Sequence, residues 1–468
     1  MIPIGLIGLA AMGRNLALNL MEKGAFVAGF DVDPEYRNVC AKDSQFHSSA
    51  FALFSDLSLF INALKPPRTL FLMIKAGDPI DQMLARLVPL LAPGDVIMDG
   101  GNSHFTATIR RERELSLHGI RYLGAGISGG TQGARHGPAI MLGGSSIPDP
   151  LWSLLQSISA HHESQPCLIH AGTDGAGHFV KMVHNGIEYA DMQLLAEAQF
   201  LLQNLTGLNL GEQACVFETW NRGALSGYLT AITAKILRKT DPETGVPALE
   251  IISDRVDHKG TGQWAAQIAL ELGVSVPNLL QAVDARLVTH MLTERAALRD
   301  RWPVHPKTLP NTDDKLALIS SLSDLLLAGR IAVFAQGFKL LATAAQRFRW
   351  NLDLGAIAAC WRGGCILQGV MPERIHLAFA DNPGLVHLLL DPGLGQSAAD
   401  GFRHGRQVIV SALMHEFPVA GLTTAIAYFD TFRQHHLCTR MVAAQRDTFG
   451  AHGFLRTDTN LRTTWDWS

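Results

Sequence analysis

The stretch IPIGLIGLAAMGRNLALNLMEKG, residues 2–24, decides the architecture of the N-terminal part of this chain. It begins as an apolar run typical of a buried strand and continues as a helical pattern that ends at Gly24, a residue suited to a helix C-terminus. The loop between them, from Gly8 to Gly13, has the pattern GxAxxG. Glycine permits the tight turn there, and a small residue lets the backbone approach a pyrophosphate at the helix N-terminus. The stretch therefore predicts a dinucleotide site, against the alternative of a turn used only for packing.

Strand and helix patterns keep alternating to about residue 175. The runs AFVAGFD, TLFLMIK, DVIMDGG and RYLGAGISGG are further apolar strands that end in glycine or polar residues. Continuous apolar strands separated by helices predict a doubly wound, Rossmann-like parallel sheet. Beyond Gly175 long amphipathic helices follow, and the last residues are polar and aromatic. We predict an α/β dinucleotide-binding domain at residues 1–176, a large all-α domain at 177–435, and a C-terminal tail at 436–468 that must dock on another surface to be ordered.

The composition excludes several classes of protein. The chain has 468 residues, a net charge of -3 and 47% hydrophobic residues, which fits a multidomain globular protein and gives no nucleic-acid surface. Its six cysteines form no CxxC pair and its histidines no HExxH motif, so we expect reduced thiols in a cytoplasmic protein and no metal. No apolar run approaches the roughly 20 residues that span a bilayer, so we expect no membrane association.

Ligands on such a sheet bind beyond the carboxyl ends of the strands. Asp31 ends the second strand, about 20 residues after the glycine loop, where an acidic residue accepts a hydrogen bond from a ribose hydroxyl. Lys75, Asn102 and residues 128–130 lie at other strand ends. Together with the loop they favour a nicotinamide dinucleotide, although a solvated strand-end aspartate is the plain alternative for Asp31.

The stretch KMVHNGIEYADMQ, residues 181–193, places polar groups where a helix normally faces a core. Lys181, His184, Asn185 and Glu188 fall at i, i+3, i+4 and i+7, on one face of a strongly apolar helix. A solvated surface face is the alternative. Gly186 sits inside the same helix at a cost of about 1 kcal/mol relative to alanine, which suggests a local reason such as the close approach of a ligand.

The residue types on this face define a reaction. Removal of a hydride from a carbinol carbon requires its hydroxyl proton to leave, and a neutral Lys181 amine can accept that proton. Glu188, if held neutral, can return a proton to carbon later. The two residues are about 10 Å apart along the helix, so a short sugar acid fits between their side-chain ends. Lys259, Thr261 and Arg286 are weaker candidates for holding a phosphate.

These motifs together resemble the decarboxylating 6-phosphogluconate dehydrogenases over essentially the whole chain. The matching stretches are GLAAMGRN, IKAG, DGGNS, GISGG, GARHGP, DGAGHFVKMVHNGIEY, KGTGQW, AQGF, WRGGCI and QRDTFGAH. The resemblance implies oxidation of the 3-hydroxyl of 6-phosphogluconate by NAD or NADP, loss of CO2 and protonation of the enediol to ribulose 5-phosphate. Either the pentose phosphate pathway or gluconate utilisation would use this reaction.

The resemblance also implies roles for residues of this chain. Lys181 matches the general base and Glu188 the general acid. The implied substrate contacts are Asn102, Ser128, Gly129, Gly130, His184, Asn185, Tyr189, Lys259, Thr261, Arg286, Arg446 and His452. The cofactor residues that we predict are Gly8, Ala10, Ala11, Met12, Gly13, Arg14, Asn15, Asp31, Val32, Asp33, Ile74, Lys75, Ala76 and Asn102. In the family, the residues that match Arg446 and His452 reach into the neighbouring subunit's site, which implies a homodimer with shared active sites, docked tails and a helical domain that also serves dimerisation.

One departure from the family bears on the cofactor. Members commonly carry Asn-Arg-Thr after the second strand, where the arginine pairs with the 2′-phosphate of NADP. Asp31, Val32 and Asp33 stand there in this chain. Two like charges about 4 Å apart repel by up to about 4 kcal/mol at an effective dielectric of 20. We therefore predict a preference for NAD, with Arg37 as the residue that could restore NADP binding.

Two other functions stay open. A non-decarboxylating β-hydroxyacid dehydrogenase would share the first domain and the Lys181 helix, but would not need Arg286 or the tail. A catalytically silent, dinucleotide-binding regulator is the second alternative, and the presence of both Lys181 and Glu188 argues against it.

Overall fold

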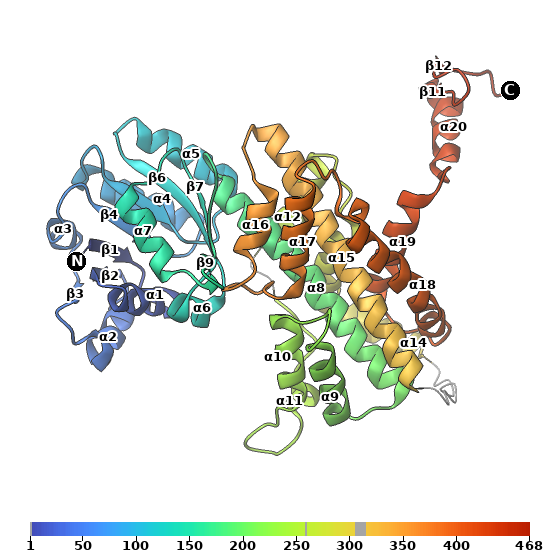
Figure 1. Cartoon of the computed structure of the whole chain (residues 1–468), viewed down its shortest axis with the longest axis horizontal. Helices are drawn as coiled ribbons and strands as arrows, with labels where there is room; N and C mark the ends of the chain where they lie inside the picture. The colour runs from blue at the N-terminus through green and yellow to red at the C-terminus, as the bar shows by residue number, and fades with distance from the viewer. Residues whose placement is uncertain (1, 258–259, 305–314) are drawn as a thin grey trace.

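The computed structural model describes residues 2–257, 260–304 and 315–468. An eight-stranded sheet occupies the N-terminal region, and long helices form the rest of the body (Figure 1). The predicted fold class, a Rossmann-like α/β region followed by a large helical region, is confirmed.

The strands of the main sheet are ordered β10-β7-β6-β5-β4-β1-β2-β3. They are β1 (Ile2–Ile7), β2 (Ala25–Phe30), β3 (Phe51–Phe54), β4 (Thr69–Leu72), β5 (Val96–Asp99), β6 (Arg121–Ile127), β7 (Ile140–Gly143) and β10 (Leu168–Gly172). All neighbours pair in parallel except β6 and β7. The prediction of a parallel sheet was wrong at this one pair. The only helix between β6 and β7 is α6 (Gly130–His136), and so short a connection returns the chain at the same end of the sheet.

Helices cover both faces of the sheet because alternate strand residues point to opposite sides. Ile4 and Leu6 pack with α1 (Ala11–Glu22) and α7 (Asp149–Ile158). Ile7 and Phe30 pack on the other face with α3 (Leu57–Asn62), α4 (Asp78–Leu87) and α5 (Phe105–Ser116). The remaining elements of this region are α2 (Pro34–Lys42), the 3-10 helices η1 (Ser44–Phe46) and η2 (Val88–Leu90), and the hairpin β8 (His161–His162) and β9 (Gln165–Pro166).

Helix α8 (Ala176–Thr206) runs from the sheet into the centre of the helical region (Figure 1). Its first turns share one hydrophobic core with Phe105 and Met141 of the sheet region. The helices around and beyond it are α9 (Leu210–Trp220), α10 (Tyr228–Leu237), α11 (Ala248–Ile251), α12 (Thr261–Glu271), α13 (Pro277–Thr289), α14 (Leu292–Arg301), α15 (Lys315–Phe348), α16 (Leu354–Cys360), α17 (Val370–Asp381), η3 (Leu388–Leu390), α18 (Pro392–Met414) and α19 (Ala420–Arg433).

Gly186 has a structural explanation. A Cβ atom there would lie 2.9 Å from the Cβ of Ala265 on α12 and 3.1 Å from Leu279 on α13. The glycine therefore allows two helices to approach α8. The suggestion that a ligand requires this glycine was wrong.

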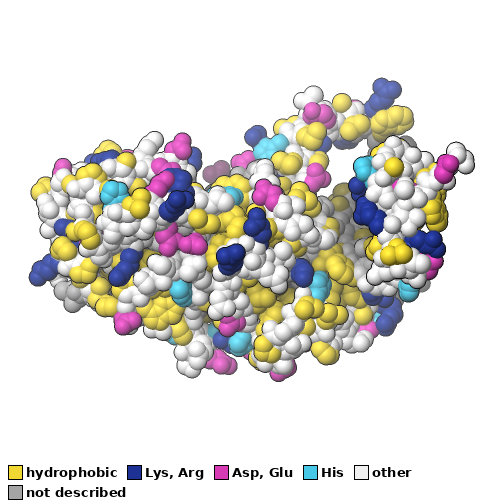
Figure 2. All heavy atoms as spheres, turned by 90° about the horizontal axis from the view of Figure 1, so that it is seen from above, with side chains coloured by type: hydrophobic (Ala, Val, Ile, Leu, Met, Phe, Trp, Pro, Cys, Tyr) yellow, Lys and Arg dark blue, Asp and Glu magenta, His cyan; other side chains and the backbone are white. Residues whose placement is uncertain are grey.

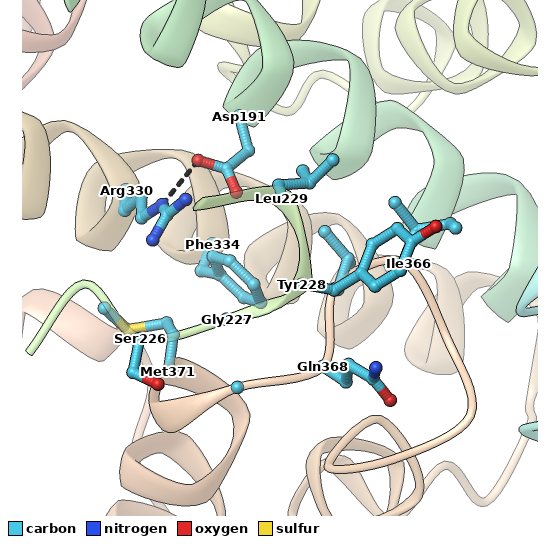
Figure 3. A pocket seen from close by; sticks show the side chains of 12 residues that line it. Asp191, Ser226, Gly227, Tyr228, Leu229, Arg330, Phe334, Ile366, Gln368 and Met371 are labelled. Carbon is cyan, nitrogen blue, oxygen red and sulfur yellow. Dashed lines mark hydrogen bonds and ion pairs between the residues drawn. The ribbon is translucent and has the colours of Figure 1, made fainter. Parts of the chain in front are cut away.

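Helix α15 is long and apolar enough to cross a bilayer by length and composition alone, so the sequence contains a more apolar segment than we expected. Half of its most apolar window is buried within the protein. Its two buried polar residues, Arg330 and Gln336, both have partners. The Arg330 side chain donates to Asp191 at 2.6 Å (Figure 3), and Gln336 donates to Asn278 at 2.8 Å. The void beside Arg330 measures about 10 Å³, which holds at most one water molecule. These contacts are those of a core helix.

The C-terminal tail projects from the body (Figure 1). It consists of α20 (Thr439–Gly450) and the hairpin β11 (Phe454–Leu455) and β12 (Arg462–Thr463). Asp447 organises it by accepting bonds from Gly453 N, Thr464 Oγ1 and the Trp467 indole at 2.7–2.8 Å. Large hydrophobic side chains nevertheless stay exposed on it, including Phe449, Trp465 and Trp467. Elsewhere, acidic and basic side chains lie interspersed over the face in Figure 2.

Candidate active site

The glycine loop joins β1 to α1 at the carboxyl edge of the sheet. Gly8 has a φ of +102°, and a Cβ on Gly13 would lie 1.8 Å from the Gly8 carbonyl oxygen. Both positions therefore require glycine. Ala10 is the N-cap of α1 and has no side chain that could occupy the first N–H groups of the helix. The loop thus presents backbone donors and a positive helix end, as a pyrophosphate requires.

The other loop residues support this arrangement. The Arg14 guanidinium donates to the Leu9 carbonyl at 3.3 Å, and the Asn15 amide donates to the Ala11 carbonyl at 2.8 Å. Ala11 and Met12 form the first turn of α1. These contacts hold the loop in shape before any ligand is present.

Asp31 lies against the glycine loop at the end of β2. Its carboxylate accepts from Leu9 N at 2.6 Å and from Asp33 N at 2.9 Å. Asp33 caps α2 by accepting from Glu35 N, and the Val32 side chain is exposed. Arg37 donates to the carbonyl oxygen of Asp31 at 2.5 Å. The buried Asp31 carboxylate therefore supports the glycine loop. The Arg37 guanidinium lies against the backbone of Asp31.

A cavity of about 190 Å³ adjoins this turn. It is lined by the predicted cofactor residues Gly8, Asp31, Val32 and Ile74, and the predicted residues Lys75 and Ala76 follow Ile74 in the chain. Ile7 of β1 also lines the cavity, together with four residues of α4 that belong to no sequence motif and were not predicted. They are Pro79, Gln82, Met83 and Arg86. A partly apolar cavity beside Asp31, the acid predicted to bind the ribose, suits the adenosine end of a dinucleotide.

The polar face of α8 points into the protein, against β6. Lys181 Nζ donates to Ser128 Oγ at 3.0 Å, and Ser128 Oγ lies 3.5 Å from His184 Nε2. The His184 ring lies 3.3 Å from the Asn185 amide oxygen and 3.6 Å from Glu188 Oε2. The surface alternative for this face is therefore wrong. A further residue makes room for the lysine, because a Cβ on Gly126 of β6 would lie 2.4 Å from the Lys181 Cβ.

Burial shifts the protonation of these groups toward their neutral forms. Loss of solvent lowers the pKa of Lys181 below its usual range, against the opposing pull of Glu188. Burial likewise raises the pKa of Glu188, against Lys181 and Arg286. The pKa of His184 falls well below its ordinary value because of burial and then because of Lys181. An amine and a carboxyl group whose pKa values are both shifted toward the neutral form are suited to accept one proton and donate another.

Other predicted substrate residues come from α12, α13, the loop after β5 and the start of α6. Thr261 on α12 accepts from the Asn185 amide at 3.0 Å. The Arg286 guanidinium stacks on the Tyr189 ring, with Cζ 3.4 Å from the ring centre. Asn102 is exposed at the end of the β5 loop, and Gly129 and Gly130 follow Ser128 at the start of α6. Lys259 lies outside the described residues.

Arg446 and His452 are not brought to this site. Both are exposed on the projecting tail, away from the sheet (Figure 1). Among residues 2–257, 260–304 and 315–468, no group of three His, Cys, Asp or Glu side chains could hold a metal ion.

A glycine loop that fits a pyrophosphate, an acid at the ribose position and a buried amine–carboxyl pair define a dinucleotide-dependent dehydrogenase class. The family models agree. The NAD binding domain of 6-phosphogluconate dehydrogenase matches residues 3–172, and the 6-phosphogluconate dehydrogenase C-terminal domain matches residues 177–467. The chain belongs to the 6-phosphogluconate dehydrogenase family.

Individual relatives span the whole chain. The decarboxylating 6-phosphogluconate dehydrogenase of Synechococcus elongatus is 41% identical over 457 residues, covering 97% of each chain. An NADP(+)-dependent and an NAD(+)-dependent decarboxylating enzyme of Bacillus subtilis are each 40% identical, and cover 97% and 99% of this chain and the same shares of their own. The solved Plasmodium falciparum 6-phosphogluconate dehydrogenase superposes with a TM-score of 0.94 at 33% identity and covers 99% of this chain and 100% of its own.

Proposed function

We propose that the protein catalyses the oxidative decarboxylation of 6-phosphogluconate to ribulose 5-phosphate and CO2, with NAD as the preferred cofactor and NADP as the weaker one. The observation that carries this proposal is the buried amine–carboxyl pair Lys181 and Glu188, aligned on one face of α8 beside the glycine-loop sheet. The names of full-length relatives and the Plasmodium structure, solved with NADP+ and with 6-phosphogluconate, support the choice of substrate.

Lys181 acts first in this proposal. Its neutral amine accepts the proton of the substrate 3-hydroxyl while Ser128 keeps Nζ aimed at the site. A bound nicotinamide dinucleotide supplies the hydride acceptor for the carbinol carbon. The resulting lysine ammonium can then donate to the new carbonyl oxygen, which favours departure of CO2 from the β-keto acid.

Glu188 acts second. Loss of CO2 leaves an enediol whose carbon must gain a proton. The carboxyl group of Glu188 can donate this proton because burial keeps it protonated at higher pH than an ordinary glutamate. His184 lies between the two groups and stays neutral, so it can hydrogen-bond a hydroxyl without adding charge.

The phosphate end is assigned to Arg286, Tyr189, Thr261 and Lys259. Arg286 stacks on Tyr189 and makes no ion pair within 4 Å to an acid of the described chain, so its guanidinium can bind a dianion. In this proposal residues 1–176 bind the dinucleotide and residues 177–435 bind the sugar acid and form the dimer.

We infer that the active protein is a homodimer. Residues 436–468 project with exposed Phe449, Trp465 and Trp467, and the predicted substrate residues Arg446 and His452 lie on the same tail. Docking of this tail on a second copy would bury the aromatic rings and carry the two cations to its site. Size measurement combined with a mixing test of Lys181→Met and Arg446→Met subunits checks this, because mixed dimers regain activity only if sites are shared.

The NAD preference follows from the turn after β2. The Asp31 carboxylate lies against the glycine loop, where a ribose would bind, and residues 32 and 33 carry no cation. Arg37 already donates to the Asp31 carbonyl, so it would have to give up this hydrogen bond to bind the 2′-phosphate of NADP.

Initial rates with 6-phosphogluconate and each of NAD and NADP, measured side by side, test the proposal. A higher kcat/KM with NAD supports it, and a higher value with NADP overturns the preference. Asp31→Asn with Val32→Arg should shift the ratio toward NADP. Arg37→Met is the matched control, and loss of NADP activity alone in this variant would show that Arg37 binds the 2′-phosphate. Cofactor binding without any turnover would favour the silent regulator instead.

A further inference from the structure

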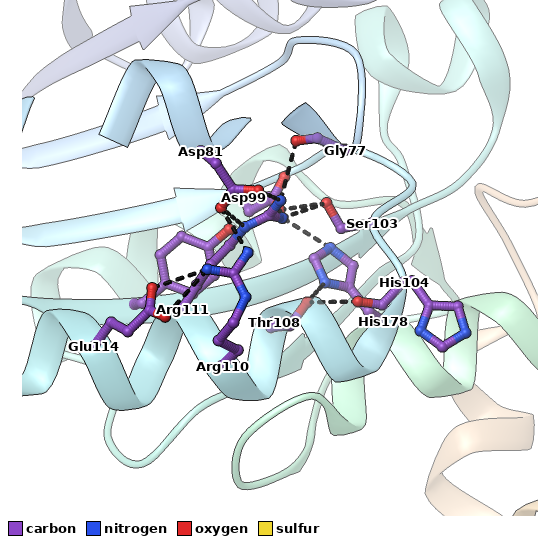
Figure 4. A network of polar contacts seen from close by, with 11 residues as sticks. Gly77, Asp81, Asp99, Ser103, His104, Thr108, Arg110, Arg111, Glu114 and His178 are labelled. Carbon is purple, nitrogen blue, oxygen red and sulfur yellow. Dashed lines mark hydrogen bonds and ion pairs between the residues drawn. The ribbon is translucent and has the colours of Figure 1, made fainter. Parts of the chain in front are cut away.

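A polar cluster connects α5 to α4 and to the residues that follow β5 (Figure 4). Its centre is Arg111 on α5, and its other members are Asp81, Asp99, Ser103 and the carbonyl group of Gly77. We call it the Arg111 cluster. The Arg111 side chain is 1% exposed, so its charge needs partners inside the protein.

The guanidinium of Arg111 bonds to two segments of the chain, residues 77–81 and residues 99–103. Each segment lies next to a different part of the predicted cofactor site. On one side Nε and Nη2 donate to the two oxygens of Asp81 at 2.9 Å each, and Nη2 donates to the Gly77 carbonyl at 3.0 Å. Gly77 directly follows the predicted cofactor residues 74–76, and Asp81 lies on α4, whose next turns line the 190 Å³ cavity. This side of the cluster therefore fixes the part of the protein that we expect to bind the adenosine end of the cofactor.

On the other side, Nη1 donates to Ser103 Oγ at 3.3 Å and lies 3.6 Å from Asp99 Oδ2. The Asp99 carboxylate also accepts from Ser103 Oγ at 2.6 Å, Tyr122 OH at 2.8 Å and Gly101 N at 2.9 Å. Asn102 sits between these bonded residues with its own side chain exposed. This side of the cluster therefore fixes the loop that presents Asn102 to substrate and cofactor.

The cluster also reaches the catalytic helix. His178, three residues before Lys181 on α8, lies 3.1 Å from the Asp99 carbonyl oxygen and 2.7 Å from Thr108 Oγ1 on α5. Burial lowers the pKa of His178, so the ring is neutral and bonds one partner with each nitrogen.

We propose that Arg111 is a positioning residue, which holds the 74–77 loop and the 99–103 loop in one fixed relation so that cofactor and 6-phosphogluconate bind in register. This inference rests on the proposed function and extends it to a residue that touches neither ligand. A planar guanidinium suits the task because it reaches both loops at once through a rigid fork of donors. A lysine ammonium has a single nitrogen and cannot bridge them.

The chain offers a matched control at the opposite ends of the same two strands. Arg68 precedes β4, and its Nη1 donates to the buried Asp95, which precedes β5, at 3.0 Å. Arg68 Nε donates to the Ile61 carbonyl at 3.2 Å. The Arg68 side chain is 12% exposed and that of Asp95 is fully buried, and the pair lies at the amino edge of the sheet, opposite the cofactor loops.

The test compares Arg111→Lys with Arg68→Lys in the full-length enzyme, using thermal melting and steady-state kinetics well below the melting temperature. Both variants should have a lower melting temperature than the wild-type enzyme. Arg111→Lys should raise the KM for NAD and the KM for 6-phosphogluconate together by about tenfold or more, since an ångström-scale displacement of positioning groups has effects of this size. Arg68→Lys should leave both KM values unchanged. The proposal would be overturned if Arg111→Lys had unchanged KM values and a lowered melting temperature like that of Arg68→Lys.

Asp81→Asn keeps the experiment decisive if Arg111→Lys does not fold. The Asp81 side chain is 37% exposed, so its neutralisation is tolerated more easily. A raised KM for NAD in this variant supports the proposal, and an unchanged one overturns it.

If the wild-type protein shows no turnover, the proposed function fails separately, and fluorescence titration with NADH still compares the three variants. Weaker binding in Arg111→Lys than in Arg68→Lys supports the positioning role, and equal binding overturns it.

Discussion

Helices α8 and α15 pack against each other in the middle of the protein, and both bury polar side chains, yet they bury them differently. On α15, Arg330 donates to Asp191, Thr230 and the Leu225 carbonyl at 2.6–3.0 Å, so each nitrogen of the guanidinium has a partner. Figure 3 shows the contact with Asp191. On α8, the Lys181 amine has one hydrogen bond within the described chain, to Ser128, although it carries three possible donors when charged.

The difference separates structural polar groups from reactive ones. A buried ion pair with complete hydrogen bonding keeps its ordinary charges. A buried amine and carboxyl group with few partners move toward their neutral forms, as the pKa directions of Lys181 and Glu188 show. Glu197, also on α8, accepts with its two oxygens from Gly421 N and Leu422 N at 2.8 Å, yet burial raises its pKa as well. Burial therefore shifts acids of both kinds, and it is the free bonding capacity of Lys181 and Glu188 that leaves these two groups able to bind a substrate.

The largest effect is expected for Lys181→Met. Without the amine this face keeps only His184 as a neutral base, and its strongly lowered pKa makes it a poor one. The value of kcat should therefore fall by about 10⁴-fold, the upper range for a general base. Affinity for NADH, measured by fluorescence titration, should stay unchanged. Lys339→Met on α15 is the matched control, because Lys339 is exposed there and its loss should leave kcat unaltered. A variant that binds NADH poorly would show that Lys181 holds the cofactor instead.

Arg330→Met probes the structural kind of polar group. It strands the buried Asp191 carboxylate, which should lower the free energy of unfolding by about 3–5 kcal/mol in urea titrations. The folded fraction should keep its wild-type kcat. A variant of normal stability but low kcat would erase the distinction between the two helices.

Glu188→Gln should lower kcat by about 100-fold, because the enediol then takes its proton from water. The wild-type enzyme needs Glu188 protonated, and burial raises the pKa of this group. Turnover should therefore fall as pH rises through that raised pKa, and this alkaline limb should be missing from the pH profile of the variant. A retained limb would assign the titration to another group.

The smallest effect concerns a buried acid outside the catalytic face. Glu112 on α5 accepts from Ser145 N at 3.2 Å, and its Oε2 has no partner in the described chain. Burial and then the nearby Asp174 raise the pKa of Glu112 from 4.5 to about 7. The folded state then holds a proton that the unfolded state releases, so stability should decline as pH rises between these values.

The decline should amount to about 1 kcal/mol after solvent screening of this half-buried group. Urea titrations of Glu112→Gln across that pH range should show a flatter dependence with unchanged kcat. The same slope in both proteins would mean that Glu112 titrates normally and that incomplete bonding does not by itself shift a buried acid.

The sequence predicted those parts of the molecule in which periodicity and function coincide. The glycine loop could be predicted because Gly8 and Gly13 have the spacing of a dinucleotide-binding loop. The polar face of α8 could be predicted because Lys181 and Glu188 have the spacing of one helix face. The antiparallel entry of β7 was not, because strand direction depends on how far the short α6 carries the chain.

Residues whose role depends on tertiary packing were missed. Met83 and Arg86 of the cofactor cavity look like ordinary residues of an amphipathic helix. Arg111 lies in the run RRER, where a charged residue is normally assigned to the solvent face. Its burial arises only because α4 and the 99–103 loop converge on α5, and no local pattern records that meeting. Gly186 showed the converse error, since a helix packing contact was interpreted as a ligand contact.

The most direct test of the central claim is the amount of CO2 released for each nicotinamide reduced when the purified protein acts on 6-phosphogluconate. An amine that accepts the hydroxyl proton and a carboxyl group that reprotonates carbon predict equal amounts of CO2 and reduced nicotinamide, with both lost in Lys181→Met. Reduction of the nicotinamide with CO2 near zero would contradict the account and identify a β-hydroxyacid dehydrogenase that does not decarboxylate.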